Sequence, residues 1–473
     1  MWALRRFRLF WAGDTISAAG GALSAVALPL LALSTLHASD TQIGVLRAAQ
    51  TLPFLLFAIP IGLLADRVSR RRLLLAADAV RFPLTAVIAL AGASLPLGGL
   101  VALVFTIGIA TMAYEVAYLS VLPELVATPA HLPAANRAVE SSHAGASLLG
   151  PAIGGALVAA LSAPAVIALD ALSFAIGATL TAINRWDRHH SAAPTRAAPT
   201  RAAPPRTAPP SVAPPSAAPA RAAFPDGAAP LNGAVPTRPA GERALTAGWN
   251  WLRHDRYVRP LTLYLAANNV AAQAFQTALL LFVVRVLDRG AAAVGLAVAA
   301  TGCGFLLGAL VSPGAAGRRG TGRVVIAASL IGALGTATVA IARGLPLVLL
   351  GAALAGAGSG LFNLHSIAIR QAITPPALLG RVNAVVKTIS YGATTTGAFA
   401  GGVAAAAFGS RAVIAAAATV SAAATLSLFT PAIRTLVGTP ARQDSPSERS
   451  PGAATADRPG QGAGRRGPAD LDP

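Results

Sequence analysis

The fold is decided by a short stretch, residues 59–72, which reads IPIGLLADRVSRRR. A long apolar segment ends at Ala65, one acid follows at Asp66, and then come the arginines Arg67, Arg70, Arg71 and Arg72. The sequence is apolar again from Leu73. A short basic turn between two apolar segments is typical of a hairpin that crosses a bilayer twice, because Lys and Arg are retained on the cytoplasmic side. A surface turn of a soluble helical protein is the alternative, and the apolar runs on both sides argue against it.

The composition indicates an integral membrane protein that lies in a lipid bilayer. Of 473 residues, 54% are hydrophobic and 12% are charged, whereas a soluble domain carries about 25% charged residues. The net charge of +19 would suit a nucleic-acid-binding protein. We expect no nucleic-acid partner, however, because the arginines lie in short turns, one linker and the tail. The single cysteine, Cys303, lies in an apolar run, so we expect no disulfide and no thiolate metal site. We also expect no other metal site and no cofactor.

Twelve apolar segments are long enough to span a bilayer, which takes about 20 residues each. The predicted spans are 8–36, 41–65, 72–92, 97–121, 137–161, 164–184, 260–286, 291–312, 323–342, 346–369, 381–408 and 410–432. Alternate loops are rich in arginine, and these hold Arg5, Arg6, Arg8, Arg67, Arg70, Arg71, Arg72, Arg137, Arg185, Arg188, Arg318, Arg319, Arg323, Arg370, Arg381 and Arg434. The other loops hold only Arg289, Arg343 and Arg411, with Arg285 just inside a span. This asymmetry predicts that both termini are cytoplasmic.

The chain divides into two predicted lobes of six helices, at residues 1–186 and 244–433. Between them, residues 187–243 consist largely of Ala-Pro-Arg repeats that cannot bury enough apolar surface to fold, so we expect a disordered cytoplasmic linker. The tail, residues 434–473, has a similar composition and is also expected to be disordered. Residues 244–259 look like an amphipathic helix that lies at the membrane interface before the seventh span. The predicted fold is therefore all-α.

The two lobes are related in sequence. Residues 136–155 align without gaps on residues 383–402, which pairs Asn136 with Asn383, Gly145 with Gly392, Gly150 with Gly397, and Gly154-Gly155 with Gly401-Gly402. A transporter built from two parallel repeats would show such a relation, with its binding site at the lobe interface.

Two motifs resemble those of the major facilitator superfamily. The basic turn fits the superfamily pattern G-x-x-x-D-R-x-G-R-R through Gly62, Asp66, Arg67, Arg70 and Arg71, with Ser69 in place of the second glycine. The fifth predicted span contains Gly150, Pro151, Gly154 and Gly155, small residues and a proline that allow helices to pack closely. This element resembles the superfamily's antiporter signature G-x-x-x-G-P-x-x-G-G, with Ala146 at the first glycine. The resemblance implies two lobes that rock about a midplane site, and it favours export by exchange.

Further segments resemble the twelve-span drug and siderophore exporter branch, which includes enterobactin exporters and macrolide efflux pumps. They are FRLFWAGDTIS at 7–17, AADAVRF at 76–82, LPELV at 122–126 and ALDALSF at 168–174. The resemblance also implies a role for Asp66, which would face the start of the eleventh span near Gly380 and Arg381. A carboxylate there meets the positive end of a helix dipole and an arginine. In the superfamily this contact closes the cytoplasmic side and breaks as the lobes rock.

Two acids within predicted spans are the candidates for proton coupling, because charged side chains in a membrane are energetically costly and usually functional. Asp14 shares a polar face of the first span with Ser17 and Ser24, and Glu115 lies beside Tyr114 in the fourth span. A carboxylate in a low-dielectric cavity can bind and release protons near neutral pH. The alternative for Asp14 is a position near water, where it pairs with Arg8.

The remaining polar residues in spans divide into a structural pair and a cavity set. Asp78 and Arg81 are one turn apart and are predicted to neutralise each other, and Asp170 is expected to be held by Ser173. The candidates for a central cavity are Tyr114, Asn269, Gln273, Gln276, Asn363, His365 and Tyr391. Polar contacts between helices are the alternative role for these residues.

The sequence thus predicts a proton-coupled exporter of a small amphipathic compound, such as an antibiotic, a siderophore or another natural product. We expect a monomer in a bacterial plasma membrane, driven by the proton gradient. The abundance of Ala, Arg, Gly and Pro suggests the GC-rich genome of a bacterium. Alternatives are an importer or uniporter on the same fold and a non-transporting membrane sensor. A membrane enzyme is disfavoured, because the sequence has no H-x-x-x-H, G-x-S-x-G or P-loop pattern.

Overall fold

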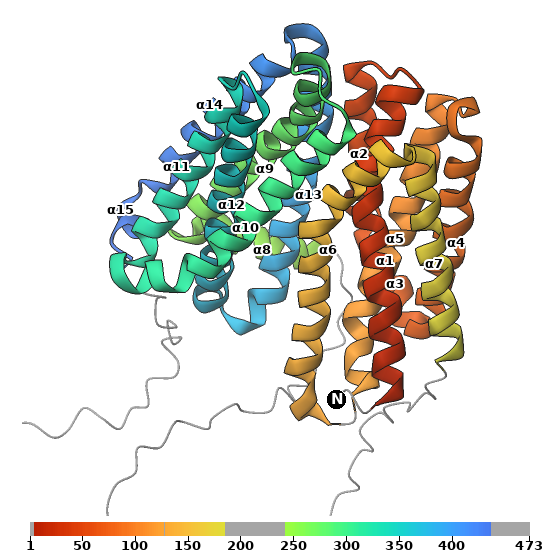
Figure 1. Ribbon diagram of the computed structural model, residues 1–473. Helices are drawn as coiled ribbons and strands as arrows, with labels where there is room; N and C mark the ends of the chain where they lie inside the picture. The colour runs from red at the N-terminus through yellow and green to blue at the C-terminus, as the bar shows by residue number, and fades with distance from the viewer. Residues whose placement is uncertain (1–3, 127, 185–241, 437–473) are drawn as a thin grey trace, which may run out of the picture.

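The structure, a computed structural model, describes residues 4–126, 128–184 and 242–436. Every regular element in these ranges is helical, and the helices form two groups that stand side by side (Figure 1). The first lobe comprises α1 (Arg5–Leu30), α2 (Asp40–Leu56), α3 (Ala58–Arg67), α4 (Arg70–Ala91), α5 (Leu97–Leu125), α6 (Leu132–Ala160) and α7 (Ala163–Ile183). The second comprises α8 (Glu242–His254), α9 (Val258–Leu281), α10 (Ala291–Arg319), α11 (Thr321–Ala340), α12 (Leu345–Ile373), α13 (Pro376–Phe408), α14 (Ser410–Ala424) and α15 (Pro431–Arg434).

The described helices account for the expected spans. Ten are long and apolar enough to cross a membrane, and the bent pair of α2 and α3 makes an eleventh. The remaining long helix is α13, whose 33 residues are less apolar because they include Lys387 and three consecutive threonines. The predicted span 410–432 is formed by α14 and a 3₁₀ turn at Thr425–Leu428, and α15 follows.

The predicted span 41–65 is formed by two helices, α2 and α3, in place of a single straight one. It bends by 53° at Phe57, between α2 and α3. Pro60 explains the bend, because its ring nitrogen has no hydrogen to donate to the carbonyl of Leu56 and its ring clashes with that carbonyl. Regular bonding resumes on both sides, from Phe57 N to Pro53 O at 2.8 Å and from Ile61 N to Phe57 O at 2.9 Å.

The amphipathic segment before the seventh span forms α8, which packs against α13. Trp251 and Leu252 of α8 lie in one apolar cluster with Val382 and Val385 of α13. The predicted linker, apart from its last two residues, and the predicted tail beyond residue 436 lie outside the described residues, as do Arg185 and Arg188.

The internal repeat extends to the first membrane-spanning helix of each lobe, α1 and α9. Both α1 and α9 end in a π-helical turn, Leu31–Thr35 and Phe282–Val286, followed by a residue in the left-handed region, His37 (φ 52°) and Asp288 (φ 51°). The closing hydrogen bonds also correspond: Leu36 N to Leu31 O is 3.1 Å and Leu287 N to Phe282 O is 3.0 Å. The two lobes therefore share local backbone detail as well as helix order.

The lobes are joined at one end of the bundle. We call the end where α1 begins the N-terminal end and the opposite end the far end. One apolar core at the far end contains residues of both lobes, such as Leu31, Ile43 and Phe282. At the N-terminal end each lobe has a separate core, around Phe7 in the first lobe and around Ile369 in the second. The cleft between the lobes is therefore sealed at the far end.

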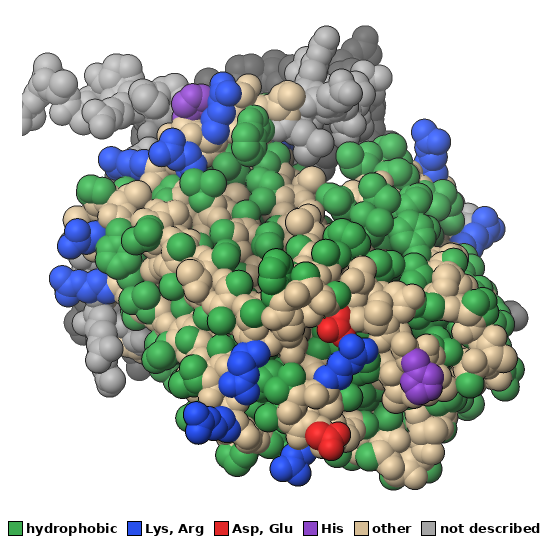
Figure 2. Space-filling view, turned by 90° about the horizontal axis from the view of Figure 1, so that it is seen from above, with side chains coloured by type: hydrophobic (Ala, Val, Ile, Leu, Met, Phe, Trp, Pro, Cys, Tyr) green, Lys and Arg blue, Asp and Glu red, His purple; other side chains and the backbone are tan. Residues whose placement is uncertain are grey.

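Paired glycines make this seal. A Cβ on Gly44 of α2 would lie 2.7 Å from the Cα of Gly402 of α13, and a Cβ on Gly155 of α6 would lie 2.8 Å from the Cα of Gly295 of α10. Arg285 of the second lobe reinforces it by donating to Ala38 O of the first at 2.8 Å and by pairing with Asp40. Seen from the far end, most side chains are hydrophobic or uncharged, with scattered charges (Figure 2).

Candidate functional site

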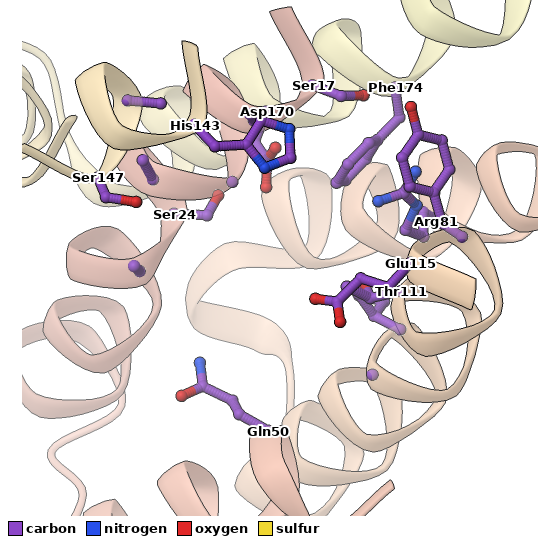
Figure 3. Close-up of a pocket in the computed structure, with 18 of the residues that line it drawn as sticks. Ser17, Ser24, Gln50, Arg81, Thr111, Glu115, His143, Ser147, Asp170 and Phe174 are labelled. Atoms are coloured by element: carbon purple, nitrogen blue, oxygen red, sulfur yellow. The ribbon is translucent and has the colours of Figure 1, made fainter. Parts of the chain in front are cut away.

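A cavity of about 450 Å³ lies on the cleft-facing side of the first lobe. It is lined by α1, α2, α4, α5, α6 and α7. The charged and polar residues in its wall include Asp14, Gln50, Arg81, Thr111, Glu115, His143, Ser147 and Asp170. Glu115 and Thr111 project into it from one wall, Gln50 points into it from α2, and His143 and Ser147 lie on α6 (Figure 3).

Asp14 is the buried centre of this site, with 1% of its surface exposed. Its Oδ1 accepts a hydrogen bond from the hydroxyl of Tyr114 at 3.1 Å, and its Oδ2 lies 2.8 Å from Nε2 of His143. Phe10 and Phe7, one and two turns earlier on α1, are also buried, so this face of the helix points inward. The alternative prediction, an Asp14 exposed to water and paired with Arg8, is therefore wrong.

Arg81 and Asp78 form the predicted ion pair, and both side chains are buried. The guanidinium of Arg81 also lies over two rings, 4.2 Å from the centroid of Tyr114 and 4.3 Å from that of Phe174. Cation–π contacts of this kind stabilise a buried charge. Arg81 therefore has a second role besides neutralising Asp78. It lies in the cavity wall against the ring of Tyr114, and the hydroxyl of Tyr114 donates to Asp14.

Glu115 differs from Asp14 in being exposed to the cleft. An aromatic wall lies next to it: Tyr118 is 6.4 Å from Tyr114 and 5.4 Å from the ring of His143, centroid to centroid. The site thus holds one carboxylate in a closed hydrogen-bonded cluster and one open to the cleft.

Asp170 completes the acidic side of the cavity. It is buried, and its Oδ1 lies 3.3 Å from the hydroxyl of Ser173, the partner that the sequence suggested. The hydroxyl of Ser17, on the Asp14 face of α1, is buried and has no hydrogen-bond partner within the described chain. Ser24, on the same face, interacts through its side chain with Asp170. An unpaired buried hydroxyl beside a cavity is available to a bound molecule.

One of the second-lobe candidates lies beside this cavity, and another makes a polar contact between helices. Tyr391 stacks on Phe54, which lines the cavity, with ring centroids 5.2 Å apart. His365 instead lies 2.9 Å from the hydroxyl of Ser312, a polar contact between α12 and α10. The other four predicted candidates are not among the lining residues of this cavity: Asn269, Gln273, Gln276 and Asn363.

The arginines of the basic turn tie the helices of the first lobe together. Arg70 pairs with Glu124 at the end of α5, and Arg71 donates to the carbonyls of Thr181 (3.3 Å) and Ala182 (2.7 Å) at the end of α7. These are the carbonyls that a helix leaves without partners at its C-terminal end.

The expected contact between this turn and α13 is not formed in the present arrangement. Asp66 and Arg67 are exposed, nothing lies within 4 Å of a Cβ on Gly62, and Asp66 makes no ion pair with Arg381 in the described chain. The backbone of Arg381 packs against Gly248 of α8 instead. This absence agrees with a cleft that is closed only at the far end.

The Gly-Pro-Gly-Gly element of α6 contacts both lobes. A Cβ on Gly154 would lie 3.0 Å from the carbonyl oxygen of Leu23, and Gly150 lies against Ala22, both on α1. Gly155, one position further, faces Gly295 of the second lobe. Pro151 is buried beside them. The close helix packing that these residues predict is present, and it joins α6 to its own lobe and to the opposite one.

The contributors to the site that the sequence did not predict include His143, Gln50 and Phe54. A signal existed for His143, because it lies seven and eleven residues before Gly150 and Gly154 and so shares their face of the helix. Gln50 and Phe54 had no such signal, since only the folded chain shows which face of α2 borders the cavity.

Comparison with known proteins gives a family match and several solved structures of similar fold. The sequence profile of the transmembrane secretion effector family matches residues 2–200 and 235–454. No curated protein sequence matches the chain. Among solved structures, the nucleoside transporter NupG is similar with a TM-score of 0.65 at 12% identity, covering 91% of this chain and 99% of that one.

Two further solved structures are similar. A bacterial homologue of the iron transporter ferroportin has a TM-score of 0.60 at 14% identity, covering 90% of this chain and 98% of that one. A bacterial homologue of the lysosomal transporter Spinster has a TM-score of 0.59 at 14% identity, covering 90% and 96%. At these identities the likeness concerns the fold, and the proteins that share it are transporters. The chain belongs to the transmembrane secretion effector family, and it is a multi-pass membrane transporter with the major facilitator fold.

Proposed function

We propose that this protein is a proton-coupled exporter that exchanges protons for a small amphipathic compound, such as an antibiotic, a siderophore or another natural product. The observation that carries the proposal is the pair of carboxylates at one cavity, Asp14 in its hydrogen-bonded cluster and Glu115 at the open cleft. Acids at membrane depth are typical of proton pathways. The resemblance to exporters in the first-half motifs supports the direction.

The arrangement of arginines supports a cytoplasmic position for the N-terminal end. The helix ends and turns there carry Arg5, Arg6, Arg8, Arg67, Arg70, Arg71, Arg72, Arg137, Arg323, Arg381 and Arg434. The far end carries only Arg285, Arg289, Arg343 and Arg411 in the described chain. We therefore propose a bacterial plasma-membrane protein that acts as a monomer, with both termini in the cytoplasm. The present arrangement would then face inward.

Exchange follows if a proton and the cargo compete for the same carboxylates. The cavity is closed toward the far end and open toward the proposed cytoplasmic side, so cargo would enter it from the cytoplasm. Its walls combine charged groups with Phe54, Tyr118 and Phe174, which suits an amphipathic molecule. Rocking of the lobes would then expose the site to the outside, where protonation replaces the cargo. No resident cofactor takes part in this proposal, and the proton gradient supplies the energy.

Replacing either carboxylate is expected to abolish exchange. In inverted membrane vesicles energised with a proton gradient, addition of a transported compound from a panel of antibiotics and siderophores should collapse the gradient for the wild type. Glu115→Gln and Asp14→Asn should show no such collapse, because neither amide can carry the proton. A pH-sensitive dye reports the gradient.

The control is Asp288→Asn, which changes an acid in a far-end turn to a residue that tolerates the same left-handed backbone. It should leave exchange unchanged. Collapse that persists in both cavity variants would contradict the proposal. Uptake of the compound in right-side-out vesicles would indicate an importer instead.

The acid of the basic turn is expected to act when the cytoplasmic side closes. Asp66→Asn should lower the transport rate by about tenfold while leaving the protein level intact, because loss of one charge-assisted contact of about 1.5 kcal/mol destabilises the closed arrangement. The measurement is transport per amount of purified protein in vesicles. Val68→Ala, in the same turn, serves as the control. Unchanged transport in Asp66→Asn would remove the gate role.

A further inference from the structure

The chain contains a single lysine, Lys387, and every other basic residue that carries a permanent charge is arginine. Lys387 lies within α13 of the second lobe, and its side chain is exposed. The sequence alone predicts no role for Lys387. A charged side chain at this position in a long membrane helix is costly unless it has a partner.

The face of α13 that carries Lys387 is fixed against the first lobe. Lys387, Tyr391 and Thr395 are spaced four residues apart, so they lie on one face of the helix. Tyr391 stacks on Phe54 of α2, and the hydroxyl of Thr395 lies 2.9 Å from that of Thr51 of α2. Lys387 lies one helical turn closer to the N-terminal end than Tyr391, where the lobes begin to separate.

Glu115 lies across the cleft from this lysine. The charged groups close enough to Glu115 to act on it are Lys387, His143 of α6 and Arg81 of α4. The other titratable groups that face Glu115 are Tyr391 of α13 and Tyr118 of α5. In the described chain Lys387 and Glu115 are not joined as an ion pair. The two opposite charges therefore face one another across an open cleft without touching.

We propose that Glu115 and Lys387 form a latch between the lobes, in which an ionised Glu115 draws Lys387 across the cleft and holds the N-terminal end closed, and protonation of Glu115 releases it. Closing this end of the cleft is the movement that brings α13 toward α5. Lys387 is thus a positioning residue, which acts on the lobes through Glu115.

The direction of this effect suits proton-driven export. After the cargo leaves at the far end, protonation of Glu115 removes the attraction that keeps the N-terminal end closed, so the protonated protein returns to the arrangement seen here. The unprotonated protein instead favours the arrangement with the N-terminal end closed. By linkage, an equilibrium that protonation shifts toward the open arrangement also makes the open arrangement bind protons more readily. The latch rests on the proposed function only in naming Glu115 as the proton carrier.

The latch is tested by measuring the distance between the lobes as a function of pH without any cargo. Spin labels at Ala130→Cys and Ala377→Cys, both exposed and at the N-terminal end, report the opening when Cys303 is replaced by serine. The wild-type background should shift from an open to a closed distance as pH rises. Lys387→Met should reduce the closed-to-open ratio at high pH about fivefold, as expected for a partly solvated charge pair.

Four further variants separate the latch from a general effect on folding. Lys387→Arg keeps the charge and should keep the pH-dependent closing, whereas Glu115→Gln should remain open at every pH. The exchanged pair, Glu115→Lys with Lys387→Glu, should restore the closing that Glu115→Lys alone abolishes. Closing in Lys387→Met with the wild-type pH dependence would overturn the proposal. Because the assay needs no transport, a vesicle experiment that shows no proton exchange would overturn the proposed function and leave the latch standing.

Discussion

Arg81→Met is expected to destabilise the protein by about 3–5 kcal/mol, because it leaves the carboxylate of Asp78 buried without its counter-charge. The side chains of the pair are 5% and 1% exposed, so water cannot replace the missing partner. Asp78→Asn should have a similar effect by leaving the guanidinium unpaired. The thermal unfolding midpoint of the purified protein, followed by size-exclusion chromatography in detergent, measures the change.

The double variant Asp78→Asn with Arg81→Met should be more stable than either single variant, since no unpaired charge remains. The matched control is Glu124→Gln, which breaks the ion pair with Arg70. Those side chains are 46% and 36% exposed, and the loss should be below about 1 kcal/mol. Single variants at positions 78 and 81 that are as mild as Glu124→Gln would contradict this account.

Arg81→Met should also disturb the surroundings of Asp14, one of the two proposed proton carriers. Arg81 lies against the ring of Tyr114, and the hydroxyl of Tyr114 donates to Asp14. Once Arg81 is shortened to methionine, the ring loses its cation and Asp14 loses a fixed donor. A protein of this variant that still folds should therefore exchange protons poorly, which distinguishes Arg81 from a purely structural residue.

Local features of the sequence predicted the helices well, because a membrane span depends on a run of apolar residues and on where arginines interrupt it. The bend at Phe57 was missed although Pro60 was visible, since composition alone does not tell whether a span accommodates its proline. The gapless repeat between 136–155 and 383–402 lies in α6 and α13, the two helices that pack against α10 and α2 of the opposite lobe.

The site was predicted in part, for a physical reason. Asp14, Glu115 and Asp78 stand out because charges are rare in apolar segments. In the structure Asp14 and Glu115 line one cavity, and Asp78 pairs with Arg81 in its wall. His143 and Lys387 did not stand out, because their importance depends on which residue faces them from another helix. The sequence also did not predict which end of the cleft is open, because the same sequence must be compatible with both arrangements of the lobes.

Gly155→Leu is expected to keep the far end from closing. A Cβ at this position would lie 2.8 Å from the Cα of Gly295 and 2.6 Å from the carbonyl oxygen of Ala291. Both neighbours are backbone atoms of α10, so no side-chain rotation relieves the contact. Overpacking of this kind costs about 3 kcal/mol, which shifts the balance between closed and open far ends about 100-fold. Transport should fall by a comparable factor.

Labels at Ala93→Cys and Arg343→Cys, on exposed turns of the two lobes at the far end, measure this opening when Cys303 is replaced by serine. The matched control is Gly145→Leu on the same helix, where a Cβ would meet nothing within 4 Å. It should leave the distance and the transport rate unchanged. An unchanged distance in Gly155→Leu would show that α6 and α10 can separate locally without moving the lobes.

A second variant, at Gly402 of α13, distinguishes a local clash from a loss of the whole seal at the far end. Gly402 faces Gly44 as Gly155 faces Gly295, so Gly402→Leu should open the same end from the other side of the interface. If each contact alone keeps the lobes in register, the two single variants should open the far end to the same distance, and the double variant should open it no further. If the contacts act independently, each variant should tilt one edge of the interface, and their effects should add. The first result would mean that the lobes move as rigid bodies and that the two glycine pairs, of which Gly155 and Gly402 correspond in the internal repeat, set the limit of closure at the far end.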